Sequence, residues 1–151
     1  MRFTTKWGAI VVLSAALVGC VSTPTSYQFD NSAISQQSFD ETWSNVIGFF
    51  AENNIPIKTL EKDSGLVVAE TGSLTDQEIT ILADCPGAVL TTSDANIANY
   101  NVFVRETQEG VKVQVNTKFT RTLRGSLSNA TQSFTCNSKG EAEKSVLAAI
   151  L

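Results

Sequence analysis

Histidine is absent from the 151-residue chain, and cysteine, proline and methionine are rare, with three, three and one copies. Histidine is the commonest metal ligand and a frequent general base, so its absence argues against most hydrolase and zinc-site chemistry. The sequence also lacks Cys-x-x-Cys, phosphate-loop and nucleophile-elbow motifs. We therefore expect a protein that is not an enzyme and has no metal site, although chemistry based on Ser, Lys or carboxylates stays open.

Long apolar runs are also scarce, and the clearest one lies near the N-terminus. Arg2 and Lys6 precede an almost wholly apolar run of twelve residues, 7–18, which is followed by a Ser- and Thr-rich segment. A transmembrane helix needs about 20 residues, so this pattern is typical of a cleaved signal peptide. We predict a signal peptide at 1–19, a flexible tether at 20–36 and one folded domain at 37–151.

The residues that end the apolar run, Leu17-Val18-Gly19-Cys20, resemble the lipobox of bacterial lipoproteins. This resemblance implies cleavage before Cys20 and a covalent lipid on its sulfur, with no other cofactor. Two or more acyl chains anchor a protein stably. Val21 stands where an Asp signals retention in the inner membrane, so the resemblance implies an outer-membrane protein whose domain faces the periplasm. The inner membrane and the cell surface are the alternatives, as is an ordinary signal with a chance cysteine.

Without Arg2 and Lys6, nine basic side chains remain against fifteen acidic ones, a net charge of −6. An acidic surface repels phosphate groups, so nucleic-acid binding is not expected, and the lipid has to provide the attachment to the membrane. With Cys20 lipidated, Cys85 and Cys136 form an even pair in an oxidising compartment, which predicts a disulfide. A redox or metal site at these two cysteines is the alternative.

The first half of the domain has clear local signals. Apolar spacing predicts a helix over residues 39–52, introduced by a capping box that starts at Ser38. Residues 55–60 and 66–70 are rich in Ile, Val and Leu and predict a hairpin, with Gly65 at positive φ in its turn.

The second half is expected to hold further strands and a second helix. Residues 79–82 predict a short strand, and 100–106 with 111–121 predict a second hairpin in which apolar and polar side chains alternate. Residues 121–133 are polar and without pattern, so we expect an irregular loop there. A second capping box, starting at Ser138, predicts the last helix.

The fold class that follows is α+β, an antiparallel sheet of about five strands with an N-terminal and a C-terminal helix on one face. The large side chains expected in its core are Phe39, Trp43, Phe50, Ile57, Leu66, Val68, Val113, Val115, Phe119 and Val146.

Two features are candidates for binding a partner. Lys118, Arg121 and Arg124 form the one basic cluster of the acidic domain, which suits an acidic partner or a glycan, although such clusters are often only solvated. Phe103 faces away from Val102 and Val104 by strand alternation. It is either an exposed partner contact or a satellite of the core.

A further resemblance covers about 30 residues. The helix with Phe39 and Trp43, followed by Ile55-Pro56-Ile57 and Asp63-Ser64-Gly65, is similar to the opening of the C-component lipoprotein of the outer-membrane β-barrel assembly machinery. That resemblance implies a helix-grip fold and assigns no functional residue. The favoured interpretation is a non-enzymatic accessory lipoprotein that binds an envelope protein. The alternative is a periplasmic module with a lipid or glycan between sheet and helix.

Overall fold

The computed structural model describes residues 23–72, 74–88 and 90–151, so Cys20 and the expected signal peptide lie outside the described residues. The described part contains three helices and seven strands, and its α+β class, with the helices on one face of an antiparallel sheet, is as predicted. Seven strands replace the expected five. In chain order the elements are β1 (Ser32–Ser35), α1 (Phe39–Glu52), β2 (Ile57–Glu61), β3 (Leu66–Thr71), α2 (Asp76–Leu82), β4 (Ala83–Asp84), β5 (Thr91–Thr107), β6 (Gly110–Gly125), β7 (Thr131–Ser138) and α3 (Glu141–Ile150).

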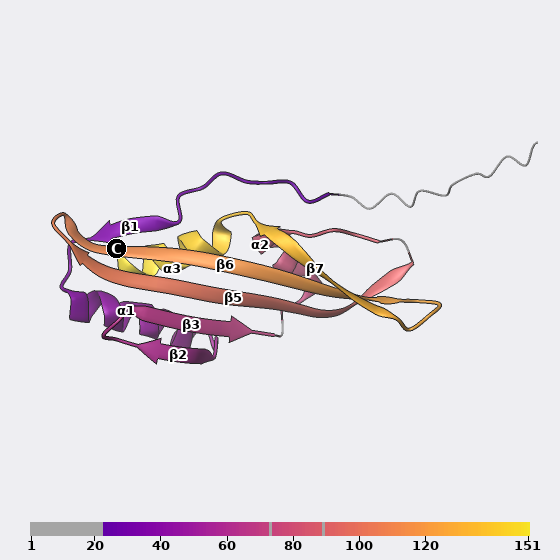
Figure 1. Cartoon of the computed structure of the whole chain (residues 1–151), viewed down its shortest axis with the longest axis horizontal. Helices are drawn as coiled ribbons and strands as arrows, with labels where there is room; N and C mark the ends of the chain where they lie inside the picture. The colour runs from indigo at the N-terminus through magenta and orange to yellow at the C-terminus, as the bar shows by residue number, and fades with distance from the viewer. Residues whose placement is uncertain (1–22, 73, 89) are drawn as a thin grey trace, which may run out of the picture.

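The long hairpin of β5 and β6 is the centre of the sheet (Figure 1). The strand order is β2-β3-β5-β6-β7-β4, and β1 pairs with the same side of β6 as β7 does, but nearer the start of the strand. With 17 residues in β5, the hairpin is about 50 Å long at roughly 3.3 Å per residue. The molecule therefore has two well-separated ends, one at the β5–β6 turn and the other where β5 begins and β6 ends.

The core lies between one face of the sheet and helices α1 and α3. Alternation along β6 is as predicted, since Val111, Val113, Val115 and Phe119 are all buried. Burying one such large side chain stabilises the fold by about 1.5–3 kcal/mol. The helices supply Trp43, Val46, Phe50, Val146 and Ile150, and the sheet adds Val67, Ala69, Ala98, Tyr100, Val102 and Val104.

The predicted helix at 39–52 and the hairpin after it are confirmed. The Ser38 hydroxyl accepts a hydrogen bond from the Glu41 backbone N–H at 3.3 Å, and the Glu41 carboxylate accepts one from the Ser38 N–H at 3.0 Å. Gly65 has φ +70° in the turn. The face of β3 differs from expectation, because Val67 is fully buried while Val68 is only partly buried.

The strand expected at 79–82 is wrong, because these residues belong to helix α2. Thr75 caps this helix, accepting from the Glu78 N–H at 3.2 Å, while the Glu78 carboxylate accepts from the Thr75 N–H at 2.7 Å. A strand would put Ile79 and Ile81 on one face, whereas the helix buries Ile79 fully and leaves Ile81 56% exposed. The second capping box of the protein therefore lies at Thr75.

Polar stretches of the chain are also partly strand, and one of them is the irregular loop expected at 121–133. Residues 91–99 form the first half of β5, and residues 121–125 and 131–133 belong to β6 and β7. These segments carry few apolar side chains, but each has a hydrogen-bonding strand beside it, and that pairing satisfies the backbone.

The expected flexible tether is wrong for Ser32–Ser35, which form β1 and pair with residues 111–114 of β6. Further towards the N-terminus, the Asn31 carbonyl accepts from the Val115 N–H at 2.8 Å, and the Thr25 N–H donates to the Asp84 carboxylate at 2.7 Å. The folded part therefore begins well before the expected boundary at residue 37.

The capping box expected at Ser138 is wrong as well. Helix α3 has Gly140, at φ +87°, as its N-cap, and no side chain caps it. The Ser138 hydroxyl instead donates to the buried Glu143 carboxylate at 2.8 Å, and Thr117 donates to the other carboxylate oxygen. These bonds attach the start of α3 to β6 and β7.

Candidate functional site

The three residues of the predicted basic cluster are not brought together. Arg121 lies on the face of β6 that carries Phe119 and Leu123, whereas Lys118 and Arg124 lie on the opposite face. Arg124 pairs with Asp94 at 2.6 Å, and Arg121 pairs with an acidic residue of α2. Two of the three charges are therefore neutralised within the protein, and the cluster is not a single positive patch.

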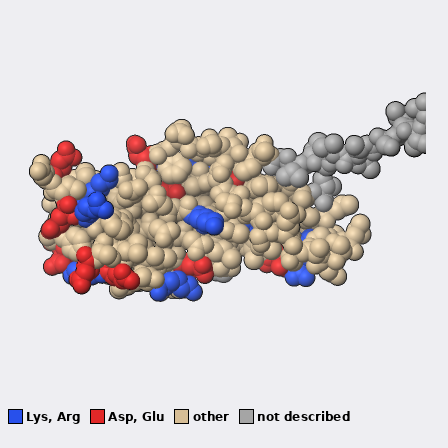
Figure 2. Space-filling view, viewed as in Figure 1, with Lys and Arg blue, Asp and Glu red and all other residues tan. Residues whose placement is uncertain are grey.

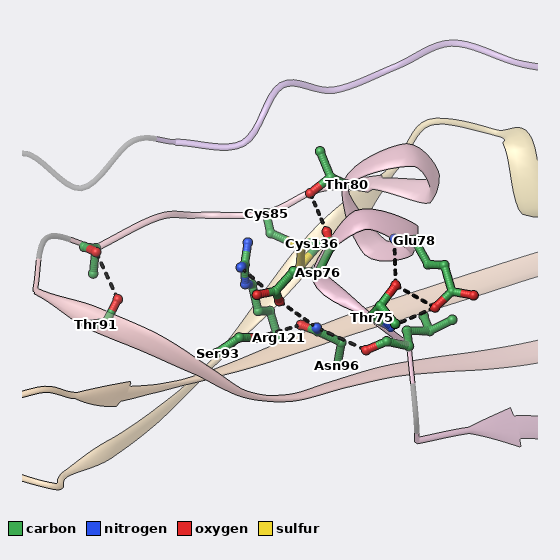
Figure 3. Close-up of polar contacts among 12 residues, drawn as sticks. Thr75, Asp76, Glu78, Thr80, Cys85, Thr91, Ser93, Asn96, Arg121 and Cys136 are labelled. Carbon is green, nitrogen blue, oxygen red and sulfur yellow. Dashed lines mark hydrogen bonds and ion pairs between the residues drawn. A yellow bond between two sulfur atoms is a disulfide. The ribbon is translucent and has the colours of Figure 1, made fainter.

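Arg121 belongs to a polar network that joins α2 to the sheet (Figure 3). Its guanidinium contacts the Asp76 carboxylate at 3.2 Å, and the Asn96 side chain donates to the same oxygen at 3.0 Å. Hydrogen bonding from Ser93, then from Asn96, and the charge of Arg121 hold the pKa of Asp76 below its ordinary value. The Arg121 side chain is 21% exposed, and its buried Nε atom lacks a hydrogen-bond partner among the described residues. The network fixes α2 in place.

The predicted disulfide between Cys85 and Cys136 is present, with the two Cα atoms 4.3 Å apart. It connects the segment after β4 to β7, close to the polar network (Figure 3). Strands β4 and β7 pair over only two residue pairs, so the covalent link supplies much of what holds this edge. The arrangement is that of a structural cross-link.

A groove of about 930 Å³ lies near the β5–β6 turn, and we call it the Phe103 groove. It is lined by residues 38–40 at the start of α1, 62–65 in the β2–β3 turn and 103–106 of β5. Phe103 is partly buried and faces away from the core, as strand alternation predicted, and the Arg105 guanidinium lies 5.1 Å from its ring centre.

The floor of the Phe103 groove is held tightly. The Gly65 carbonyl accepts a hydrogen bond from the Val104 N–H at 2.8 Å, and a Cβ on Gly65 would lie 2.0 Å from the Val104 carbonyl oxygen. Lys62 in the turn forms an ion pair of 2.8 Å with Asp40 of α1, across the groove. The groove thus combines a half-buried aromatic side chain with exposed charged side chains around it, on a fixed backbone.

Sequence reasoning identified Phe103 and missed the residues around it. Asp40, Lys62 and Arg105 lie in three segments that are far apart in the chain, and no local pattern connects them. The usable signal was the apolar ring at an outward position of a strand, next to an arginine two residues later.

Within the described ranges, none of the helices is long and apolar enough to cross a membrane. The same residues contain no group of three or more His, Cys, Asp or Glu side chains that is arranged to bind a metal ion.

No protein-family model matches the sequence, and a comparison with curated proteins finds no significant match.

Proposed function

We propose that this chain is a lipoprotein of the bacterial outer membrane, anchored by a lipid on Cys20, whose periplasmic domain is a non-enzymatic, partner-binding subunit of an envelope assembly. The observation that carries the proposal is the Phe103 groove. Aromatic and arginine side chains dominate the energetics of protein interfaces, and here Phe103 and Arg105 lie together at the surface.

The position of the Phe103 groove supports a role in contacting another protein. Phe103 lies twelve residues along β5 from Thr91, about 40 Å at roughly 3.3 Å per residue. From β1 back towards residue 23, the chain runs along the molecule in the direction of the end where β5 begins (Figure 1). A lipid anchor at that end would leave the groove directed away from the membrane, where a periplasmic protein can reach it.

The alternative of a lipid- or glycan-binding module would need space between the sheet and the C-terminal helix. In the described structure that space is filled by core side chains, since Val146 and Ile150 of α3 are fully buried against the sheet. The surface groove is therefore the better supported binding site, and its charged rim suits a protein surface more than an acyl chain.

The experiment is site-specific photo-cross-linking in cells. A benzophenone amino acid placed at Phe103 is expected to give an adduct of discrete mass with an envelope protein. The same amino acid at Lys118, which is exposed on the sheet, serves as the control. An adduct at both positions, or at neither, contradicts the proposed surface.

A quantitative test follows once the adduct identifies the partner. Phe103→Ala is expected to weaken binding by about 2 kcal/mol, roughly 30-fold, as for an interface hot spot. Phe134→Ala removes a phenyl ring of similar burial on β7 and should leave affinity unchanged.

The anchor is tested separately, because Cys20→Ser should move the protein from the membrane to the soluble fraction. Full membrane retention of Cys20→Ser contradicts the lipid assignment.

A further inference from the structure

Two leucines are displayed at the end of the hairpin opposite the β5–β6 turn. Leu127 is 89% exposed and Leu90 is 67% exposed. The Ser126 N–H donates to the Leu90 carbonyl at 2.9 Å, and the Gly125 N–H donates to the Ala130 carbonyl at 2.8 Å. These bonds hold Leu90 against the β6–β7 turn, so both side chains project from an ordered backbone. We call Leu90 and residues 125–130 the apolar tip.

The backbone of Leu90 is unusual. Its φ is +58°, in the left-handed region that residues other than Gly, Asn and Asp seldom adopt. The surrounding hydrogen bonds maintain this conformation, although the leucine side chain gains little burial from it. A strained residue with an exposed apolar side chain points to a role outside the fold itself.

The apolar tip lies in a region with very little charge. Positions 85–93 and 125–138 contain no Lys, Arg, Asp or Glu. The nearest charged residues on the strands, Asp94 and Arg124, neutralise each other in an ion pair. Figure 2 shows most charged side chains of the visible face gathered towards the opposite end of the molecule. This end of the molecule is therefore suited to apolar contact and not to electrostatic attraction by lipid headgroups.

The N-terminal segment is attached to β7 about midway along the hairpin, because Cys136, next to Asn137, pairs with Phe119, which in turn pairs with Ala98 of β5. The Asn137 side chain donates to the Pro24 and Thr25 carbonyls at 3.2 and 2.9 Å. Thr25 is five positions along the chain from Cys20, a reach of about 18 Å at most. From Asn137, β7 runs six residues to Thr131 beside the tip, about 20 Å. The maximum distance from Thr25 to Cys20 and the distance from Asn137 to the tip are thus nearly equal.

We propose that the apolar tip rests on the bilayer that holds the Cys20 lipid, with Leu90 and Leu127 in the interfacial layer. This inference rests on the proposed lipid anchor. A short tether and a second, apolar contact together orient the domain, and the Phe103 groove then stands about 40 Å from the membrane surface. Because the tip lacks basic side chains, the contact does not require anionic lipid.

The test uses the full lipidated protein in phosphatidylcholine vesicles, with and without a lipid that carries a nitroxide near the top of its acyl chain. An environment-sensitive fluorophore is attached at Leu127→Cys, which is exposed enough to be replaced without loss of the fold. Gln108→Cys, in the β5–β6 turn, is the matched control at the other end. We expect the nitroxide to remove most of the Leu127→Cys fluorescence and to leave the Gln108→Cys signal unchanged.

A second pair of proteins shows whether the leucines cause the contact. The fluorophore at Ser128→Cys should be quenched in the otherwise unaltered protein, and quenching should fall several-fold when Leu90→Asn and Leu127→Asn are added. Equal quenching in both proteins overturns the proposal, as does an unquenched Leu127→Cys probe in protein that floats with the vesicles. An unquenched Leu127→Cys probe in floating protein is also the result expected if the tip binds a protein instead. If the protein does not float with vesicles at all, the lipid anchor is wrong, and that failure is separate.

Discussion

Replacing both cysteines of the disulfide by alanine should destabilise the domain by about 4 kcal/mol. Cys85 and Cys136 are 51 positions apart, and closing a loop of that length removes about 14 cal/mol/K of entropy from the unfolded chain in the chain-entropy account. The loss of two sulfur atoms adds little, because only Cys136 is buried. For the roughly 130 residues that follow the predicted signal peptide, this loss of stability lowers Tm by about 15 °C.

The assay is urea unfolding of residues 23–151, which lack Cys20, exported behind an ordinary secretory signal. Cys85→Ala/Cys136→Ala is compared with the parent protein, and the parent unfolded in the presence of a reductant is the matched control. Hydrogen exchange should show the largest loss of protection at β4 and the facing residues of β7, since those strands pair over only two residue pairs. If the double variant loses less than about 1 kcal/mol of unfolding free energy relative to the parent without reductant, the proposed loop restraint is refuted.

Two further variants test the polar network and the Phe103 groove. Asp76→Asn should cost about 1 kcal/mol at pH 7, because it removes the negative partner of the mostly buried Arg121. The pKa of Asp76 is lowered in the folded protein, so its contribution is present above the unfolded pKa of about 4 and disappears as the pH falls through the lower folded value; urea midpoints of variant and parent that stay apart in strong acid contradict this. Gly65→Ala should cost about 2 kcal/mol or more, because the turn needs φ +70° and the new Cβ meets the Val104 carbonyl; thermal unfolding measures it, and an unchanged Tm contradicts the close approach.

Some of the fold could be predicted because its signals are local. Helix α1 has its cap, its apolar stripe and its terminating residues in one stretch, and the structure begins and ends it where the spacing does. The alternation in β6 likewise identifies the buried face without knowledge of any neighbour. In such segments propensity, pattern and tertiary environment agree.

Other elements depend on partners that are distant in sequence. Thr91 to Asn99 has the composition of a loop and is a strand because β6 continues beside it. Ser32–Ser35 is a strand because it covers the free edge of β6 at residues 111–114. The prediction for the α2 segment was wrong for another reason. Three apolar residues in a short run suit either a helix or a strand, and the cap at Thr75 decides between them.

The candidate site shows the same division. The outward direction of Phe103 follows from alternation alone, whereas the Phe103 groove exists only because Gly65 lets the β2–β3 turn approach β5 and because Lys62 reaches Asp40 on α1. The basic residues illustrate the reverse case, in which neighbours in sequence lie on opposite faces of β6 and pair with different acidic residues.

The sequence by itself determined the acidic surface, the absence of histidine, the lipobox-like segment that ends at Cys20, the first helix and the buried face of β6, because each depends on composition or on residues within one or two turns. Only the tertiary structure decided the length of the central hairpin, the separation of Lys118 from Arg121, the Phe103 groove and the apolar tip. Backbone pairing between distant strands is favourable wherever a partner strand is present, whatever the polarity of the side chains, and this non-local energy is what a single stretch of sequence does not contain.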